Sequence, residues 1–400
     1  MKSISVCVLS LLVACSITAT GEPKKSNLIV ELENTQTSIL IKKIFYEYPT
    51  QEPRRKAGYL KKRLKEIEER VELRYLSKNN KKEIAILEFL ANKESSLKKD
   101  TSFSNRVRYL SSLSYPIEAG FSMLMKEKAE IEKNLSESRL EFLNPQILGQ
   151  SKIHESLFFE SNDYGRQKYL DLLAYELKNT ENLALSILRN YPKSALKVVG
   201  ETGANFSFYY RDRVLRINID NVETMPKDET IALAAFFGLP GAGAIEEENT
   251  ISLSKFLYLP SYNLGWAAYS LNEIAKSDPE NSEAYLRFSK LIVVLGLTDL
   301  NIHSGKWTSY EGREFLKKNS YYSANREQLF LEQLQARPGL FLSINLGKIF
   351  FNEMKRKCLE KISLDFCGKA LNQLIVDQGT VPLPYLKNLL IERFLSNSLP

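Results

Sequence analysis

Residues 231–249 read IALAAFFGLPGAGAIEEEN, an apolar helical run that stops at a turn rich in glycine and proline and ends in three glutamates. The glycines have the spacing G-x-x-G-x-G, which is neither the dinucleotide fingerprint nor the Walker pattern, and no Lys-Ser or Lys-Thr pair follows. Glu246, Glu247 and Glu248 would repel a phosphate at this turn. The stretch therefore does not predict a nucleotide site, and its two phenylalanines need another explanation.

The sequence around this stretch predicts a mainly α protein. Residues 205–221 alternate apolar and polar side chains around Arg211 and Asp212, which predicts a small β-hairpin or a pair of short strands. From Leu60 onward, apolar residues recur at helical spacing while charged residues occupy the other faces. Similar amphipathic stretches, each predicting a helix, cover residues 84–97, 117–135, 169–188, 283–297 and 344–362.

Composition limits the classes of function. The chain has 400 residues, of which 44% are hydrophobic and 26% charged, so it can bury a large core. Its net charge is +7, but basic and acidic residues are interleaved. This pattern is typical of solvated helix faces and predicts no nucleic-acid partner, although a basic surface facing anionic lipid remains open. We expect an N-terminal helical region at 31–200, packed as one domain with a second region at 201–400.

The N-terminus is typical of an exported lipoprotein. Residues 1–14 contain Lys2, a short apolar stretch and then small residues, as signal peptides do, and the stretch is too short to span a bilayer stably. Residues 12–15, LVAC, resemble a bacterial lipobox, in which Cys15 would carry fatty acyl chains such as palmitate. Residues 15–30 would then form a lipidated tether. A plain secretory signal, cut near Ala19 or Thr20, is the alternative.

The residue after the lipidated cysteine bears on localisation. In many Gram-negative bacteria, an Asp directly after the lipidated cysteine resembles a signal that retains the protein in the inner membrane. This chain has Ser16 at that position. We therefore expect a protein of the bacterial cell envelope, anchored by lipid, and favour the outer membrane.

Cys358 and Cys367 are the two cysteines left after the signal peptide and the lipidated residue. In an oxidising compartment they could form a disulfide. Nine residues of continuous helix would hold them too far apart, whereas a turn near Ser363 would bring them together. The sequence leaves both arrangements open.

Three common catalytic patterns are missing from the sequence. A peptidase zinc site needs two histidines on one helix face and a neighbouring glutamate, but the only histidines, His154 and His303, are far apart. No G-x-S-x-G nucleophile elbow occurs, and the cysteines have no nearby histidine. Acidic residues are too numerous for the sequence to select a catalytic pair.

Six short motifs nevertheless occur in a recognisable order. They resemble the bacterial domain of unknown function 885 family, large helical proteins that are often exported and look like zinc metallopeptidases. The resemblance covers roughly residues 200–390, and it implies a large helical, metallopeptidase-like domain. The motifs are RINI at 216–219, FFGLPGAG at 236–243, LGWA at 264–267, DLNIH at 299–303 with KWT at 306–308, PGLFLSINLG at 338–347, and GTVPL at 379–383.

The departures from the family pattern fall on the metal chemistry. The resemblance implies that the family's zinc ligands and catalytic base correspond to five residues of this chain that cannot bind a cation. These residues are Phe236, Phe237, Ala242, Gly243 and Leu264. Buried polar ligands left without a metal would cost about 1–3 kcal/mol each, so apolar replacements avoid that cost. We interpret the two phenylalanines as filling the former ligand positions. The expected cofactor is none, with zinc lost.

Asp299 and His303 are the only matched polar pair of interest. His303 would be a neutral, hydrogen-bonded structural residue near Asp299, or a remaining general acid or base in a changed site.

The sequence thus favours a membrane-anchored lipoprotein that has lost peptidase chemistry and binds an unknown peptide or protein. One alternative is an active hydrolase with a rebuilt site around Asp299, His303 and the three glutamates at 246–248. Another is a purely structural envelope protein.

Overall fold

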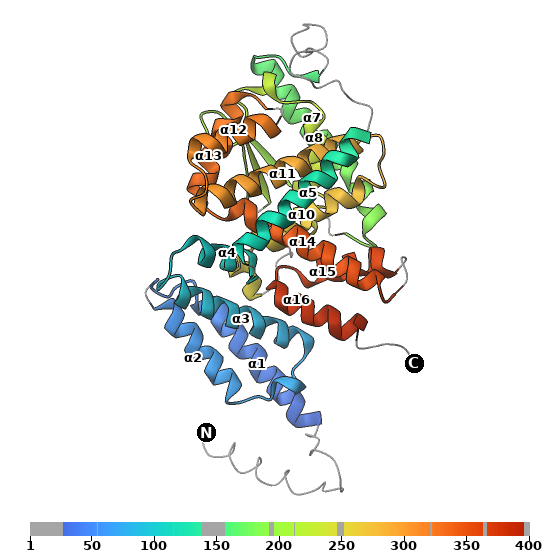
Figure 1. Ribbon diagram of the computed structural model, residues 1–400. Helices are drawn as coiled ribbons and strands as arrows, with labels where there is room; N and C mark the ends of the chain where they lie inside the picture. The colour runs from blue at the N-terminus through green and yellow to red at the C-terminus, as the bar shows by residue number, and fades with distance from the viewer. Residues whose placement is uncertain are drawn as a thin grey trace, which may run out of the picture.

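The computed structural model describes residues 27–53, 55–114, 116–137, 157–191, 196–211, 213–245, 252–320, 322–362 and 366–395, and the fold is mainly α, as predicted (Figure 1). The helices before the sheet are α1 (Asn27–Glu47), α2 (Lys56–Glu68), α3 (Lys78–Ser96), α4 (Phe103–Ser111), α5 (Ile117–Glu137) and α7 (Asp163–Ile187). Those after it are α8 (Glu229–Phe237), α9 (Ala242–Ile245), α10 (Pro260–Ile274), α11 (Ser282–His303), α12 (Ser309–Asn319), α13 (Ala324–Ala336), α14 (Leu340–Leu359), α15 (Leu371–Gln378) and α16 (Leu383–Leu390).

The sheet has three strands in the order β1-β3-β2. β2 (Phe208–Arg211) and β3 (Val214–Asn218) pair antiparallel, which confirms the predicted hairpin. β1 (Lys197–Glu201) pairs parallel to β3 and was not predicted. Five residues carry too short a pattern to be recognised, and β1 depends on a partner strand that lies further along the chain.

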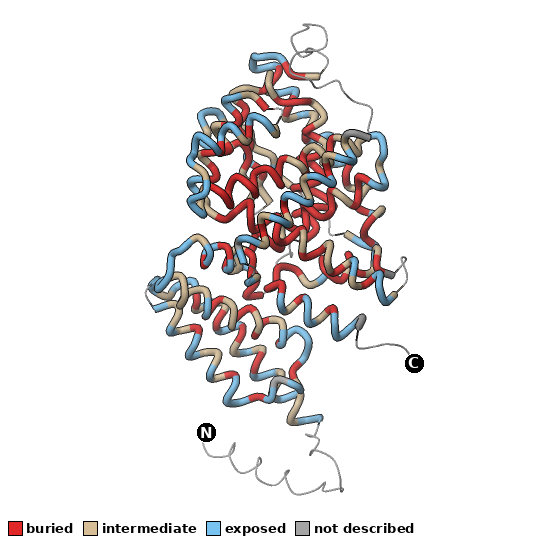
Figure 2. The backbone as a smooth tube through the Cα atoms, in the orientation of Figure 1, coloured by how far each residue is buried: buried red, intermediate tan, exposed pale blue. Residues whose placement is uncertain are grey.

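Helices α10, α11 and α14 form the centre of the larger body, and α5 lies along α11 (Figure 1). Helices α1, α2 and α3 gather at the end of the molecule where the described chain begins. Buried residues concentrate around the central helices (Figure 2). One hydrophobic cluster nevertheless runs from Ile41 in α1 to Leu390 in α16, so both parts share a core.

Close backbone contact sets the spacing of α10 and α14. A Cβ atom on Gly347 would lie 1.8 Å from the carbonyl oxygen of Ser261, and one on Gly265 would lie 2.8 Å from the Cα of Gly347. Any side chain at these two positions would push the helices apart. The PGLFLSINLG and LGWA motifs are therefore, in part, the contact surfaces of two central helices.

Two expected boundaries differ from the structure. α1 begins at Asn27, so residues 27–30, expected in the tether, are helical. Leu28 and Leu32 have the helical spacing that continues through this helix, which explains the early start. The expected boundary between residues 200 and 201 falls inside β1, and α5 and α7 pack on α11 and α8 of the second region. Residues 1–26, with Cys15 and the signal peptide, lie outside the described residues.

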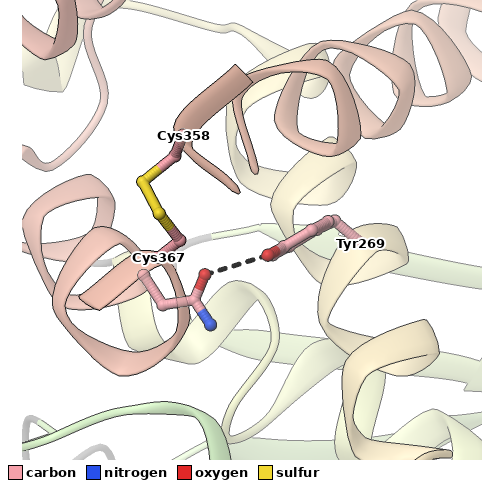
Figure 3. The surroundings of a disulfide bond; sticks show 4 residues. Tyr269, Cys358 and Cys367 are labelled. Carbon is pink, nitrogen blue, oxygen red and sulfur yellow. Dashed lines mark hydrogen bonds between the residues drawn. A yellow bond between two sulfur atoms is a disulfide. The ribbon is translucent and has the colours of Figure 1, made fainter. Parts of the chain in front are cut away.

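A disulfide joins Cys358 at the end of α14 to Cys367 just before α15 (Figure 3). α14 ends at Leu359, so the cysteines are not in one continuous helix, and their Cα atoms are 5.6 Å apart. The turn expected near Ser363 lies outside the described residues. Both cysteines are buried, and the Tyr269 hydroxyl nearby donates to Oδ1 of Asn372 at 3.0 Å. The bond therefore ties α14 to the start of α15 within the core.

Removing this disulfide is expected to lower the free energy of unfolding by about 3 kcal/mol, the chain-entropy value for a short closed loop. The comparison is urea unfolding of the parent and of a Cys358→Ala, Cys367→Ala variant. A reducing agent should destabilise the parent and leave the double variant unchanged. Equal stability of the oxidised parent and the variant would show that the bond adds nothing.

Candidate functional site

Phe236 and Phe237 end helix α8 in the middle of an aromatic cluster. Their exposed fractions are 1% and 2%, and their ring centroids are 4.8 Å apart. Phe236 also contacts Phe288 of α11 at 5.3 Å, and Phe237 contacts Phe208 of β2 at 5.4 Å. Rings from a helix, a second helix and the sheet therefore surround this position.

A hydrogen bond fixes the turn after α8. The indole Nε1 of Trp266 in α10 donates to the carbonyl oxygen of Pro240 at 2.9 Å, and both residues are buried. The FFGLPGAG and LGWA motifs are thus joined directly in space, although 26 residues separate the bonded pair. This contact preserves the bend of the chain without any metal ligand.

The other three implied ligand positions are equally apolar. Ala242 and Gly243 are buried in the short helix α9, and Leu264 is half-buried in α10. None of the five positions has a side-chain donor atom for a cation. Within the described ranges, no group of three or more His, Cys, Asp and Glu side chains is arranged to hold a metal. The residues present do not fit a zinc ion.

Asp299 is a residue of α11 whose side chain binds the start of α14. It is fully buried in α11, its Oδ1 accepts the backbone N–H of Gly339 at 2.9 Å, and its Oδ2 accepts that of Leu342 at 3.1 Å. These are the N–H groups that a helix start leaves unpaired, so the carboxylate caps α14. Burial raises the pKa of Asp299 to about 7, against the opposing effect of the backbone N–H groups.

His303 is the last residue of α11, and its ring centroid lies 5.5 Å from that of Phe103. Its Nδ1 is buried and has no hydrogen-bond partner among the described residues, and burial together with Arg106 lowers its pKa. No hydrogen bond joins it to Asp299 in the part of the chain that the structure describes. Asp299 binds the start of α14, whereas the His303 ring packs against Phe103 of α4, so the two side chains contact different elements.

A cleft of about 890 Å³ lies between helices α1–α4 and the second half of the chain. Its walls come from the end of α1, the start of α2, the end of α3, from α4 and β2, from residues 255–259 with the start of α10, and from the α13–α14 junction. The described residues that line it include six basic side chains and no aspartate or glutamate. These basic residues are Lys56, Lys93, Arg106, Arg211, Lys255 and Arg337.

Tyrosine rings accompany these charges. The guanidinium of Arg337 lies over the ring of Tyr209 at 4.2 Å, and the Lys56 ammonium lies over Tyr48 at 4.9 Å. Such contacts hold cations in place without neutralising them. The five lining tyrosines are Tyr48, Tyr109, Tyr209, Tyr210 and Tyr258.

Lys93 is a lysine of the cleft whose pKa is shifted. It is half-buried near the end of α3, and withdrawal from water lowers its pKa, partly offset by the neighbouring Glu94 carboxylate. A desolvated cation gains more from an incoming anion than a hydrated one does. The cleft is therefore suited to negatively charged groups.

The cleft and the aromatic cluster share a wall. A void of about 30 Å³ is lined by Phe236, Phe237 and Leu264, and Leu264 also lines the cleft. Tyr209, Tyr210, Tyr258, Arg337 and Leu340 likewise border both spaces. Three of the five implied ligand positions, Phe236, Phe237 and Leu264, thus meet at the void beside the cleft. Ala242 and Gly243 line neither the void nor the cleft.

The basic residues of the cleft were not predicted from the sequence. They come from separate segments, and each taken alone is typical of a solvated surface position. Only a cluster within one segment would have given a signal. Glu246, Glu247 and Glu248, named for a rebuilt hydrolase site, lie outside the described residues.

Comparison with known proteins supports the fold and the family resemblance. Residues 208–390 match the family described as bacterial protein of unknown function, DUF885. None of the curated proteins matches the chain. The fold is similar to the crystal structure of a protein from Colwellia psychrerythraea provisionally described as a lipoprotein, with a TM-score of 0.60, 14% identity, and coverage of 95% of this chain and 78% of that one.

A second solved structure shows the same likeness. It is from Shewanella oneidensis and is provisionally described as a lipoprotein of unknown function. Its TM-score is 0.54 at 14% identity, covering 90% of this chain and 72% of that one. At this identity, the similarity establishes the fold alone.

Proposed function

Residues 208–390 of this chain match the DUF885 family, and from this premise we propose that the protein is a lipid-anchored envelope protein that binds an anionic peptide segment without catalysis. The observation that carries the proposal is the basic, tyrosine-lined cleft, whose wall includes Leu264, one of the implied metal positions, and which adjoins the void lined by Phe236 and Phe237.

The anchor rests on the N-terminal sequence. Cys15 follows a lipobox-like LVA, and acylation there would hold the chain at a membrane. Both structurally similar proteins carry lipoprotein descriptions, which is consistent with such an anchor. None of the described helices is long and apolar enough to cross a membrane. Ser16 favours placement in the outer membrane.

Loss of catalysis is supported by the packing of the implied site. Phe236 and Phe237 are buried in a tight aromatic cluster that offers no ligand for a cation. Asp299, the main residue of the alternative hydrolase, uses both carboxylate oxygens to cap α14. A carboxylate held in this way is poorly placed to act as a general base toward a bound substrate.

The ligand's chemistry follows from the cleft. Six basic side chains without a described acidic neighbour in the lining favour a ligand with several negative charges. The volume is in the usual range of ligand pockets, and the tyrosines offer apolar faces with hydroxyl tips. A peptide is favoured because the family resemblance implies a peptidase-like scaffold, and Leu264, one of its implied ligand positions, lines the cleft. An acidic peptide segment satisfies both conditions.

Binding is tested on the purified lipidated protein in detergent with a fluorescein-labelled oligoglutamate peptide. Lys93→Ala and Arg337→Ala are each expected to weaken binding about tenfold, the effect of losing about 1.4 kcal/mol at a central contact. Lys361→Ala is the matched control, because Lys361 is exposed and does not line the cleft. Binding should also weaken as salt is added.

Several results would contradict the proposal. An oligolysine peptide that binds as tightly as oligoglutamate would refute charge selection. Equal effects of all three substitutions would place the ligand outside the cleft. Elemental analysis that finds about one equivalent of tightly held zinc would overturn the loss of the metal.

A further inference from the structure

Helix α1 has an unusually apolar outer face. Of the twelve large hydrophobic residues that are exposed in the described chain, four lie on this one helix. They are Leu28, Leu32, Ile39 and Tyr46, with exposed fractions of 74%, 46%, 60% and 63%. These four residues are called the α1 stripe below.

The spacing of the α1 stripe aligns it along one side of the helix. Intervals of four, seven and seven residues correspond to whole helical turns, so the four side chains follow nearly the same line. The opposite side of α1 is already packed, because Thr37, Ile41 and Ile44 are buried. α1 is therefore apolar on two sides, and core packing uses only one of them.

The charges around the α1 stripe favour an anionic surface. Lys42 and Lys43 lie on the exposed side of α1, between Ile39 and Tyr46, and Glu31 is the acidic residue on that side. Lys43 is 3.7 Å from Glu47, and both side chains remain partly exposed. An apolar line with flanking lysines is typical of helices that lie in the interfacial region of a membrane.

The position of α1 in the chain indicates which surface it meets. α1 is the first described element, and only eleven residues, 16–26, lie between Cys15 and Asn27. Eleven residues reach at most about 40 Å when fully extended and about 20 Å as a flexible coil. A lipid on Cys15 would therefore keep α1, itself about 30 Å long, close to the bilayer.

We infer that the α1 stripe docks on the surface of the anionic membrane to which the protein is anchored, with its side chains in the headgroup region. The inference rests on the proposed lipid anchor but not on the cleft or its ligand. Docking would add a second membrane contact to the acyl chains and would orient the molecule. Tyr48, which follows α1 directly, lines the cleft, so the orientation of α1 also sets where the cleft opens relative to the membrane.

The experiment places a tryptophan on the α1 stripe and measures quenching by brominated lipid. The lipidated full-length protein is reconstituted into vesicles of phosphatidylethanolamine and phosphatidylglycerol, with and without bromine on the acyl chains. Tyr46→Trp is compared with Tyr175→Trp on α7, because these tyrosines are 63% and 60% exposed and lie on different helices. The native Trp266 and Trp307 provide the same background in both variants.

Brominated lipid is expected to lower the tryptophan emission of Tyr46→Trp more than that of the parent. For Tyr175→Trp, the loss of emission should equal that of the parent. Adding Ile39→Glu to Tyr46→Trp should abolish that loss, since a carboxylate on the stripe opposes insertion. Circular dichroism confirms that each variant is folded.

The possible failures are distinguishable. If the protein does not float with the vesicles, the lipid anchor itself is refuted. If the protein floats and Tyr46→Trp is not quenched, or is quenched no more than Tyr175→Trp, the anchor stands and docking by α1 is refuted. A concentration-dependent blue shift of Tyr46→Trp without vesicles would assign the stripe to a second copy of the chain and overturn the inference.

Discussion

Glu229→Gln is expected to lower the free energy of unfolding by about 3–5 kcal/mol, because it leaves the guanidinium of Arg326 buried without its counter-ion. The Glu229 and Arg326 side chains are 1% and 2% exposed, and Nη1 and Nη2 of Arg326 each donate to one carboxylate oxygen of Glu229 at 2.6 Å. The Tyr322 hydroxyl also donates to Glu229, and Arg326 Nε donates to Ser207 beside the sheet. Urea unfolding at neutral pH measures the change.

Glu201→Gln is the matched control for this prediction. Glu201 in β1 pairs with Arg216 in β3 at the protein surface, where removal of one partner should cost less than about 1 kcal/mol. Replacing both buried partners by Glu229→Leu and Arg326→Met should recover most of the stability lost in Glu229→Gln, since no unpaired charge remains. Equal losses for Glu229→Gln and Glu201→Gln would show that burial does not govern this pair.

Asp299→Ala is expected to destabilise the protein by about 2–5 kcal/mol. The substitution removes both acceptors of the Gly339 and Leu342 N–H groups, and each buried unpaired donor costs about 1–3 kcal/mol. Thermal or urea unfolding measures the loss. Unchanged stability, combined with loss of some hydrolytic activity of the parent, would instead support the alternative in which Asp299 is catalytic.

The ionisation of Asp299 predicts how stability depends on pH. Its pKa is about 7 in the folded protein and near the ordinary value of 3.8 in the unfolded chain. Between pH 3.8 and 7, Asp299 holds its proton more tightly in the folded state than in the unfolded chain. The stabilisation that protonated Asp299 contributes is therefore fully present below about pH 4 and is lost as the pH rises through 7. Asp299→Asn, which cannot ionise, should flatten this part of the stability profile. A parent whose stability is constant from pH 4 to 7 would contradict the prediction.

Much of the secondary structure could be predicted because its signals are local. Helical spacing of apolar residues around Leu60 predicted α2, and alternation around Arg211 predicted the β2–β3 hairpin. Phe236 and Phe237 lie in an apolar run and are buried, and their interpretation as former metal-ligand positions stays a prediction. Each of these features depends on neighbours within a few residues, which a single segment contains.

Other features depend on contacts between distant segments. β1 exists through its pairing with β3, and Asp299 has its role because the start of α14 lies 40 residues further along the chain. The sequence left the pairing of Cys358 and Cys367 open, because it turned on where one helix ends. No local pattern encodes these arrangements.

The sequence by itself determined a mainly helical chain with a small hairpin, and the family resemblance assigned apolar residues, Phe236 and Phe237 among them, to its implied metal positions. Only the tertiary structure decided that six scattered basic residues line one cleft beside that filled centre, and that α1 leaves an apolar stripe uncovered. The physical reason is that burial and the grouping of charges are properties of packed surfaces. Such surfaces form only when segments far apart in the chain come together.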